Sequence, residues 1–103
     1  MDLKNRILFI MPKDDVQRLR FDEGKNGILD VTVDVHGMKC VQVRKLLNNL
    51  LNVVRTVVRI IVIHGYNHSC EIKKMIAADF HHPHMASHFA DSYNQGITYI
   101  YSI

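Results

Sequence analysis

The feature that most constrains this chain is a short pattern that occurs twice. An apolar, strand-like run ends in His-Gly and is followed by residues typical of a helix, first in VDVHGM (33–38) and again in IVIHGY (61–66). A strand, a helix and a second strand joined in this way form a parallel crossover unit. The repeat therefore predicts an α/β fold in which both His-Gly pairs follow the carboxyl end of a strand.

The residues around the first His-Gly pair have clear periodicities. Apolar side chains alternate with polar ones over 28–35, which predicts a strand with one buried and one open face. The apolar positions are Leu29, Val31, Val33 and Val35, and the polar positions are Asp30, Thr32 and Asp34. After His36-Gly37 the period becomes helical, with an apolar stripe at Val43, Leu46, Leu47, Leu50 and Val54.

The same reading continues to the end of the chain. Val57–Ile63 is nearly all apolar and suits a central strand. A second helix, capped by Asn67 or Ser69 and ended by Pro83, has its apolar stripe at Ile72, Met75, Ile76 and Phe80. Residues 86–93 and Ile97–Ile103 read as two strands joined by a turn at Gly96.

The predicted fold is a two-layer β-α-β-α-β-β sandwich with a mixed four-stranded sheet. Helical crossovers favour parallel pairing among the first three strands, and the short turn makes the last pair antiparallel. The polar side of the first strand indicates that one sheet face has no helical cover. We expect residues 27–103 to form this domain and residues 1–26 to be an N-terminal extension. In that extension, Ile7–Met11 is a candidate extra edge strand and Asp22–Gly27 reads as a linker.

Length and composition limit the classes of protein. A chain of 103 residues with 48% apolar side chains is one folded domain. Two cysteines are too few for a disulfide framework, and neither a signal peptide nor a membrane-length apolar stretch is present. We therefore expect a cytoplasmic protein without a membrane partner, and the sequence leaves its oligomeric state open.

The two His-Gly pairs also define a candidate site. Ligands of open α/β sheets bind at the carboxyl edge of the strands, and neighbouring parallel strands end side by side there. We expect His36 and His64 to line one surface concavity, with Asp34 on the same side of its strand as His36. Gly37 and Gly65 would allow sharp turns whose backbone N–H groups suit a phosphate. One acid and two imidazoles form a candidate acid–base set with a bell-shaped pH–rate profile; turn-capping histidines without chemistry are the alternative.

The distribution of charge favours an anionic partner. Residues 35–74 contain one acid, Glu71, and the bases Lys39, Arg44, Lys45, Arg55, Arg59, Lys73 and Lys74. Such a basic region suits a phosphate backbone. A solvated face of two helices is the alternative reading.

These motifs together resemble the small MutS-related (Smr) domain family over Leu29–Ile103. Val33-Asp34-Val35-His36-Gly37 is similar to the motif that ends the family's first strand, with Val in place of Leu. His64-Gly65-Tyr66-Asn67 matches the first half of the H-G-x-G motif, and Asn67 replaces the second Gly. Gly96-Ile97-Thr98 matches the family's closing pattern of a Gly before a Thr-containing final strand.

The resemblance implies a two-layer domain that binds DNA or RNA, and some members of the family nick DNA or cut RNA. By this resemblance, Asp34, His36 and His64 are the catalytic residues, and Gly65 is a nucleic-acid-binding residue. The further nucleic-acid contacts that we expect are Gly37, Lys39, Arg59, Tyr66, Asn67, Lys73 and Lys74. Arg59, Lys73 and Lys74 are expected because they flank the His64 turn.

Three functions stay open at this point: a nuclease, a non-catalytic nucleic-acid-binding module and a protein-interaction module. No cofactor or metal is assigned. RNA is the easier substrate for metal-free cleavage, because its 2′-hydroxyl is a built-in nucleophile.

A tract of histidines follows the second predicted helix, with His81, His82 and His84 around Pro83 and with His88 nearby. Such a tract can bind a metal, but no cysteine pair or second cluster completes a tetrahedral zinc site. We therefore favour a solvated loop.

Overall fold

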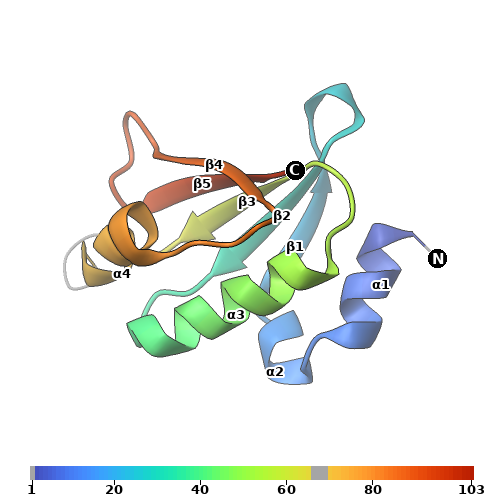
Figure 1. The fold of residues 1–103 in the computed structure, drawn as a ribbon, viewed down its shortest axis with the longest axis horizontal. Helices are drawn as coiled ribbons and strands as arrows, with labels where there is room; N and C mark the ends of the chain where they lie inside the picture. Colours follow the sequence, from blue (N-terminus) through green and yellow to red (C-terminus); the bar gives the residue numbers. More distant parts are fainter. Residues whose placement is uncertain (1, 66–69) are drawn as a thin grey trace.

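The computed structural model describes residues 2–65 and 70–103, and within them five strands form one mixed sheet (Figure 1). The spatial order of the strands is β1-β2-β3-β5-β4. Their bounds are β1 (Leu19–Glu23), β2 (Leu29–Asp34), β3 (Val58–Ile63), β4 (Met85–Ala90) and β5 (Ile97–Ser102). β2 and β3 pair in parallel, and every other neighbouring pair is antiparallel.

The helices come before and between these strands. Their bounds are α1 (Leu3–Ile10), α2 (Lys13–Val16), α3 (Cys40–Val53) and α4 (Cys70–Lys74). α4 runs on into a π-helical segment, Met75–Asp79, and a 3₁₀ turn at Lys25–Gly27 joins β1 to β2. The general α/β class predicted from the sequence is confirmed.

One face of the sheet forms the core. Along β3, Val58, Ile60 and Val62 are fully buried, and the residues between them are half-buried. The predicted stripes of both helices are buried in the same hydrophobic core as these strand residues. Val31 and Val33 of β2 and Ile100 of β5 are buried on the same face as these β3 residues, with which they pair.

The N-terminal residues differ from the prediction. Ile7–Met11 is not an edge strand, because Leu3–Ile10 is a helix with Asp2 Oδ1 accepting from the Asn5 amide at its start. Asp22–Gly27 is not a linker, because its first residues belong to β1, which pairs antiparallel with β2. β1 supplies the extra edge strand that the sequence suggested, so the sheet has five strands rather than four among the described residues.

The place of the last two strands also differs. β4 does not pair with β3, because β5 lies between them and is antiparallel to both. β5 buries every second side chain, Thr98, Ile100 and Ser102, whereas no residue of β4 is fully buried. The more buried strand therefore takes the interior position and the more polar strand the edge.

The other face of the sheet carries aromatic side chains. Tyr99 and Tyr101 alternate with the buried residues of β5 and lie on the open face. Phe89 of β4 stacks on Tyr101, and the Arg59 guanidinium lies 5.3 Å from the centre of the Tyr99 ring.

Within the described part of the chain, no helix combines the length and the apolar character needed to cross a bilayer.

The first prediction concerns α1, which contributes Ile7 to the core. Ile7→Ala should lower the free energy of unfolding by about 2–5 kcal/mol, the usual cost of a core cavity of this size. Urea denaturation of the full chain measures this. Phe9→Ala is the matched control, because Phe9 is 79% exposed on the same helix and should change stability by about 0.5 kcal/mol or less. Equal small effects of the two substitutions would show that α1 is not part of the folding unit.

Candidate strand-end site

The two His-Gly pairs lie at the same edge of the sheet, as predicted. β2 and β3 are neighbours, and Asp34 pairs with Ile63 in the parallel register. His36 follows the end of β2 and His64 follows the end of β3. Gly37 and Gly65 both have positive φ, 80° and 77°, so each chain reversal uses a conformation that glycine adopts without strain.

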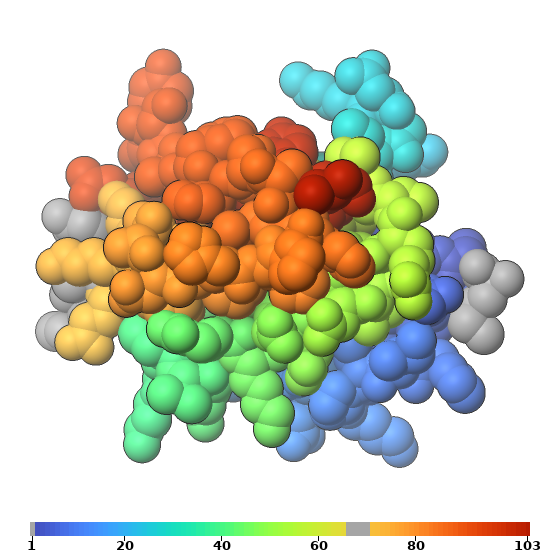
Figure 2. Space-filling model, viewed as in Figure 1, coloured from blue at the N-terminus to red at the C-terminus, as the bar shows by residue number. Residues whose placement is uncertain are grey.

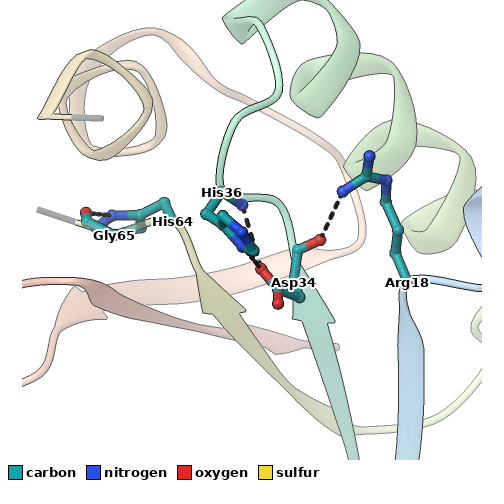
Figure 3. Close-up of polar contacts among 5 residues, drawn as sticks. All are labelled: Arg18, Asp34, His36, His64 and Gly65. Atoms are coloured by element: carbon teal, nitrogen blue, oxygen red, sulfur yellow. Dashed lines mark hydrogen bonds and ion pairs between the residues drawn. The ribbon is translucent and has the colours of Figure 1, made fainter. Parts of the chain in front are cut away.

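Asp34 and His36 form an exposed pair at this edge (Figure 3). Asp34 Oδ1 lies 2.5 Å from His36 Nδ1 and also accepts a hydrogen bond from the His36 amide at 3.2 Å. A carboxylate oxygen accepts, so the neutral imidazole carries its proton on Nδ1 and its lone pair on Nε2. The His36 side chain is 71% exposed, which leaves the ring accessible to a ligand.

The surroundings of Asp34 favour its ionised form. Partial burial raises the pKa of this carboxyl, but the hydrogen bonds from the side chain and backbone of His36 and the charges of His36 and Arg18 outweigh it. The net pKa lies below the ordinary 3.8, so Asp34 is a carboxylate at neutral pH. Its side chain is 49% exposed, and solvent weakens these charge interactions accordingly.

Arg18 is a site residue that the sequence analysis did not identify. It directly precedes β1, and its Nη1 donates to the Asp34 backbone carbonyl at 3.2 Å (Figure 3). The Asp34 amide in turn donates to the Arg18 carbonyl, so strand pairing places this cation beside the acid. The alternation of Leu19, Arg20, Phe21 and Asp22 before a Gly-rich turn was the signal for this hairpin.

His64 is buried, and this differs from the expected open site. Its ring is 0% exposed, with Nδ1 2.7 Å from the Gly65 carbonyl oxygen and Nε2 2.8 Å from Thr98 Oγ1. Figure 3 shows this ring directed away from His36 rather than toward it. The expectation that both histidines line one surface concavity is therefore wrong for His64, because its ring fills a polar niche between β3 and β5.

The partners of His64 fix its protonation. The Gly65 carbonyl accepts only, so Nδ1 carries the proton, and in the neutral ring Nε2 accepts from the Thr98 hydroxyl. Burial lowers the pKa of His64 below the ordinary 6.5; the bond to Gly65 opposes this, and the charge of Lys73 lowers the pKa further. His64 is thus neutral at neutral pH, and both ring nitrogens have protein partners.

Gly96 connects the third sequence motif to the second. Its carbonyl accepts from the amides of both His64 and Gly65, at 2.9 and 3.1 Å. A Cβ on Gly96 would lie 3.2 Å from the Gly65 Cα, so the two glycines pack at close quarters. The expectation that the Gly65 amide binds a phosphate is not met here, because that N–H already donates to Gly96.

The remaining predicted contacts are spread over the molecule. Arg59 does not flank the His64 turn: it lies near the start of β3, about 16 Å along the strand at the usual rise. Its guanidinium pairs with Asp30 through Nε at 3.0 Å and Nη2 at 2.7 Å. Lys39 precedes α3 and is exposed, while Lys73 and Lys74 end α4. Tyr66 and Asn67 lie outside the described residues.

A cavity of about 350 Å³ lies beside Arg18. Arg18 and Met38 belong to its wall, and the other lining residues come from Pro12 and α2 on one side and α3 on the other. Neither His36 nor His64 lines this cavity, so it is not the shared concavity that we expected. In the described ranges, 2–65 and 70–103, no group of three or more His, Cys, Asp or Glu side chains is placed to hold a metal ion.

No model of a known protein family, no curated protein and no solved structure matches this chain. The geometry of the strand ends is therefore what supports a functional assignment.

The second prediction tests the partner of His64 on β5. Thr98→Val removes the hydroxyl at nearly constant volume and leaves a buried acceptor without a donor. The free energy of unfolding should fall by about 1–3 kcal/mol. Thr98→Ser is the matched control, because it keeps the hydroxyl, and it should cost less than Thr98→Val in the same denaturation experiment. A larger loss in Thr98→Ser would mean that the methyl group, not the hydrogen bond, matters.

The third prediction concerns pH. The folded state lowers the pKa of His64, so the unfolded chain binds a proton first as the pH falls below the ordinary value of 6.5. Stability should be greatest above that value and should fall on acidification from about pH 7.5 to about pH 5.5. The pKa of His82 is also lowered in the folded state, so His82 adds to the same loss of stability on acidification. Denaturation midpoints across this range should fall less steeply in His64→Gln; a flat profile in the parent would contradict the assignment.

Proposed function

We propose that this chain is a nucleic-acid-binding domain similar to the Smr family and that it cleaves RNA at the strand-end site, with His36 as its general base. The observation that carries the proposal is the exposed Asp34–His36 pair, in which Asp34 holds Nδ1 and the Nε2 lone pair is left for a substrate. Arg18 lies beside this pair as a phosphate ligand. Lys39, at the start of α3, follows His36 by three residues, and the charge of Lys73 acts on the His64 ring.

The chemistry follows from a base of this kind. His36 Nε2 removes the proton of a 2′-hydroxyl, and the freed oxygen attacks the adjacent phosphorus. The bond from phosphorus to the 5′-oxygen breaks, which leaves a 2′,3′-cyclic phosphate and a 5′-hydroxyl. Water supplies the proton to the leaving oxygen. His64 cannot supply it, because its ring is buried and both ring nitrogens are hydrogen-bonded within the protein.

This mechanism differs from the two-histidine scheme in its pH dependence. Two titrating imidazoles give a bell-shaped pH–rate profile, whereas a single base gives a rate that rises with pH to a plateau. His64 has a positioning role here, since it shapes the turn at the end of β3.

The second candidate function is nucleic-acid binding without cleavage. The burial of His64 favours it, because one of the two imidazoles assigned to catalysis does not reach the surface. Binding through phosphates requires only the cations of this edge, and affinity should then fall steeply as salt rises.

The fourth prediction separates these functions. Labelled single-stranded RNA should be cut to cyclic-phosphate ends, and DNA of the same sequence should stay intact. His36→Ala should lower the rate by about 100-fold or more, the usual effect of a general base. His88→Ala, which removes a histidine of β4, is the matched control and should cut at the parental rate.

Measuring RNA affinity alongside cleavage distinguishes the nuclease from the binding module and from the protein-interaction module. Arg18→Gln should weaken RNA binding and reduce its salt dependence, whereas Arg20→Gln on the same hairpin should have a smaller effect. Full activity of folded His36→Ala would contradict the catalytic role. Salt-dependent binding without any turnover would establish the binding module. If the chain bound no nucleic acid, the protein-interaction module would be the remaining function.

A further inference from the structure

The histidine tract that the proposed function does not use is tied to the last turn of α3. His82 Nε2 lies 2.7 Å from Asn52 Oδ1, and His84 Nδ1 lies 2.8 Å from the Leu51 carbonyl oxygen. The two imidazole rings meet edge to face, with their centres 5.1 Å apart. Figure 2 shows the surface of this region, where the segment after α4, in orange, lies against α3, in green.

A third contact fixes the protonation of His82. The His84 amide donates to His82 Nδ1 at 2.9 Å. A backbone amide can only donate, so Nδ1 must carry a lone pair and the neutral ring must carry its proton on Nε2, toward the Asn52 oxygen. His84 is not restricted in this way, because its Nδ1–H faces a carbonyl oxygen in both protonation states.

Protonation of His82 therefore breaks this arrangement. A proton on Nδ1 would point at the His84 N–H and replace an attractive contact with a repulsive one. Burial, and then the charge of His84, lower the pKa of His82 below the ordinary 6.5. His84 is the titratable group that faces His82 from its own loop, and α3 faces it with the uncharged Asn52. Asp79 and His81 precede it in the same segment.

The segment held by these contacts is one wall of a groove. A cavity of about 450 Å³ separates α3 from Asp79, Phe80 and His81. On α3 its lining residues recur at helical spacing, at Val41, Arg44, Lys45 and Asn48. Leu51 and Asn52 lie one helical turn beyond Asn48, so the histidine contacts hold segment 79–84 to α3 next to this groove.

We propose that Leu51, Asn52, His82 and His84 form a proton-operated clasp that fastens segment 79–84 to α3 while His82 is neutral and releases it on acidification. The hydrogen-bond geometry carries this proposal. It is independent of the RNA-cleaving function, because no member of the clasp belongs to the strand-end site.

The fifth prediction tests the clasp through the His84 amide in the full-length chain. Its hydrogen-exchange protection, corrected for the intrinsic rate at each pH, should fall about 10-fold or more between pH 7.5 and pH 5.5. The amide of Ile60 in β3 reports global unfolding, and the loss of protection at the His84 amide should exceed any loss at Ile60 that the fall in stability of the third prediction causes.

Two variants make the result specific. His82→Asn keeps a side-chain acceptor two residues before the His84 amide but does not titrate, so protection should persist at both pH values. His82→Ala has no acceptor and should be unprotected at both. Protection of the parent that does not change with pH, or a loss in His82→Asn equal to that of the parent, would overturn the proposal.

Discussion

The turn at the end of β3 depends on its contacts with the start of β5. The Gly96 carbonyl accepts from the amides of His64 and Gly65, and Thr98 donates to the His64 ring. These bonds satisfy polar groups that burial would otherwise leave unpaired at a cost of about 1–3 kcal/mol each. They also explain why a Gly-x-Thr sequence opens the final strand: the glycine permits close approach, and the threonine hydroxyl reaches the imidazole.

The two His-Gly pairs are alike in sequence but differ in physical role. β2 has the edge strand β1 beside it, and the chain after β2 turns outward, so His36 is exposed and paired with Asp34. β3 lies between β2 and β5, and the His64 ring is enclosed where β3 and β5 meet. One histidine therefore keeps a nitrogen for a ligand, while the other has both nitrogens bonded to the protein. This asymmetry is the reason that the proposed chemistry uses one imidazole.

Much of the fold was predictable because periodicity reports burial. The alternation over 29–35 and the stripe of α3 gave the correct strand, helix and buried face. The insertion of β5 between β3 and β4 was not predictable from connection lengths, since it reflects which strand buries more surface. α1 was missed because a short apolar run such as Ile7–Met11 fits a helix and a strand equally well.

The site was predictable in position but not in exposure. Strand-end rules placed His36, Asp34 and His64 at one edge, and the parallel register of β2 and β3 agrees. Burial of His64 depends on Thr98 and Gly96, more than 30 residues away in sequence, which no local pattern reports. The position of Arg18 beside Asp34 depends in the same way on the pairing of β1 with β2, whose connection, Asp22–Gly27, reads as a linker in the sequence.

The neutral, buried state of His64 is the central claim, and nitrogen-15 NMR of the histidine rings at neutral pH tests it most directly. The account predicts a His64 ring with a protonated Nδ1 and an unprotonated Nε2, the latter accepting a hydrogen bond. A His64 that is an imidazolium at neutral pH, or that carries its proton on Nε2, would contradict the account.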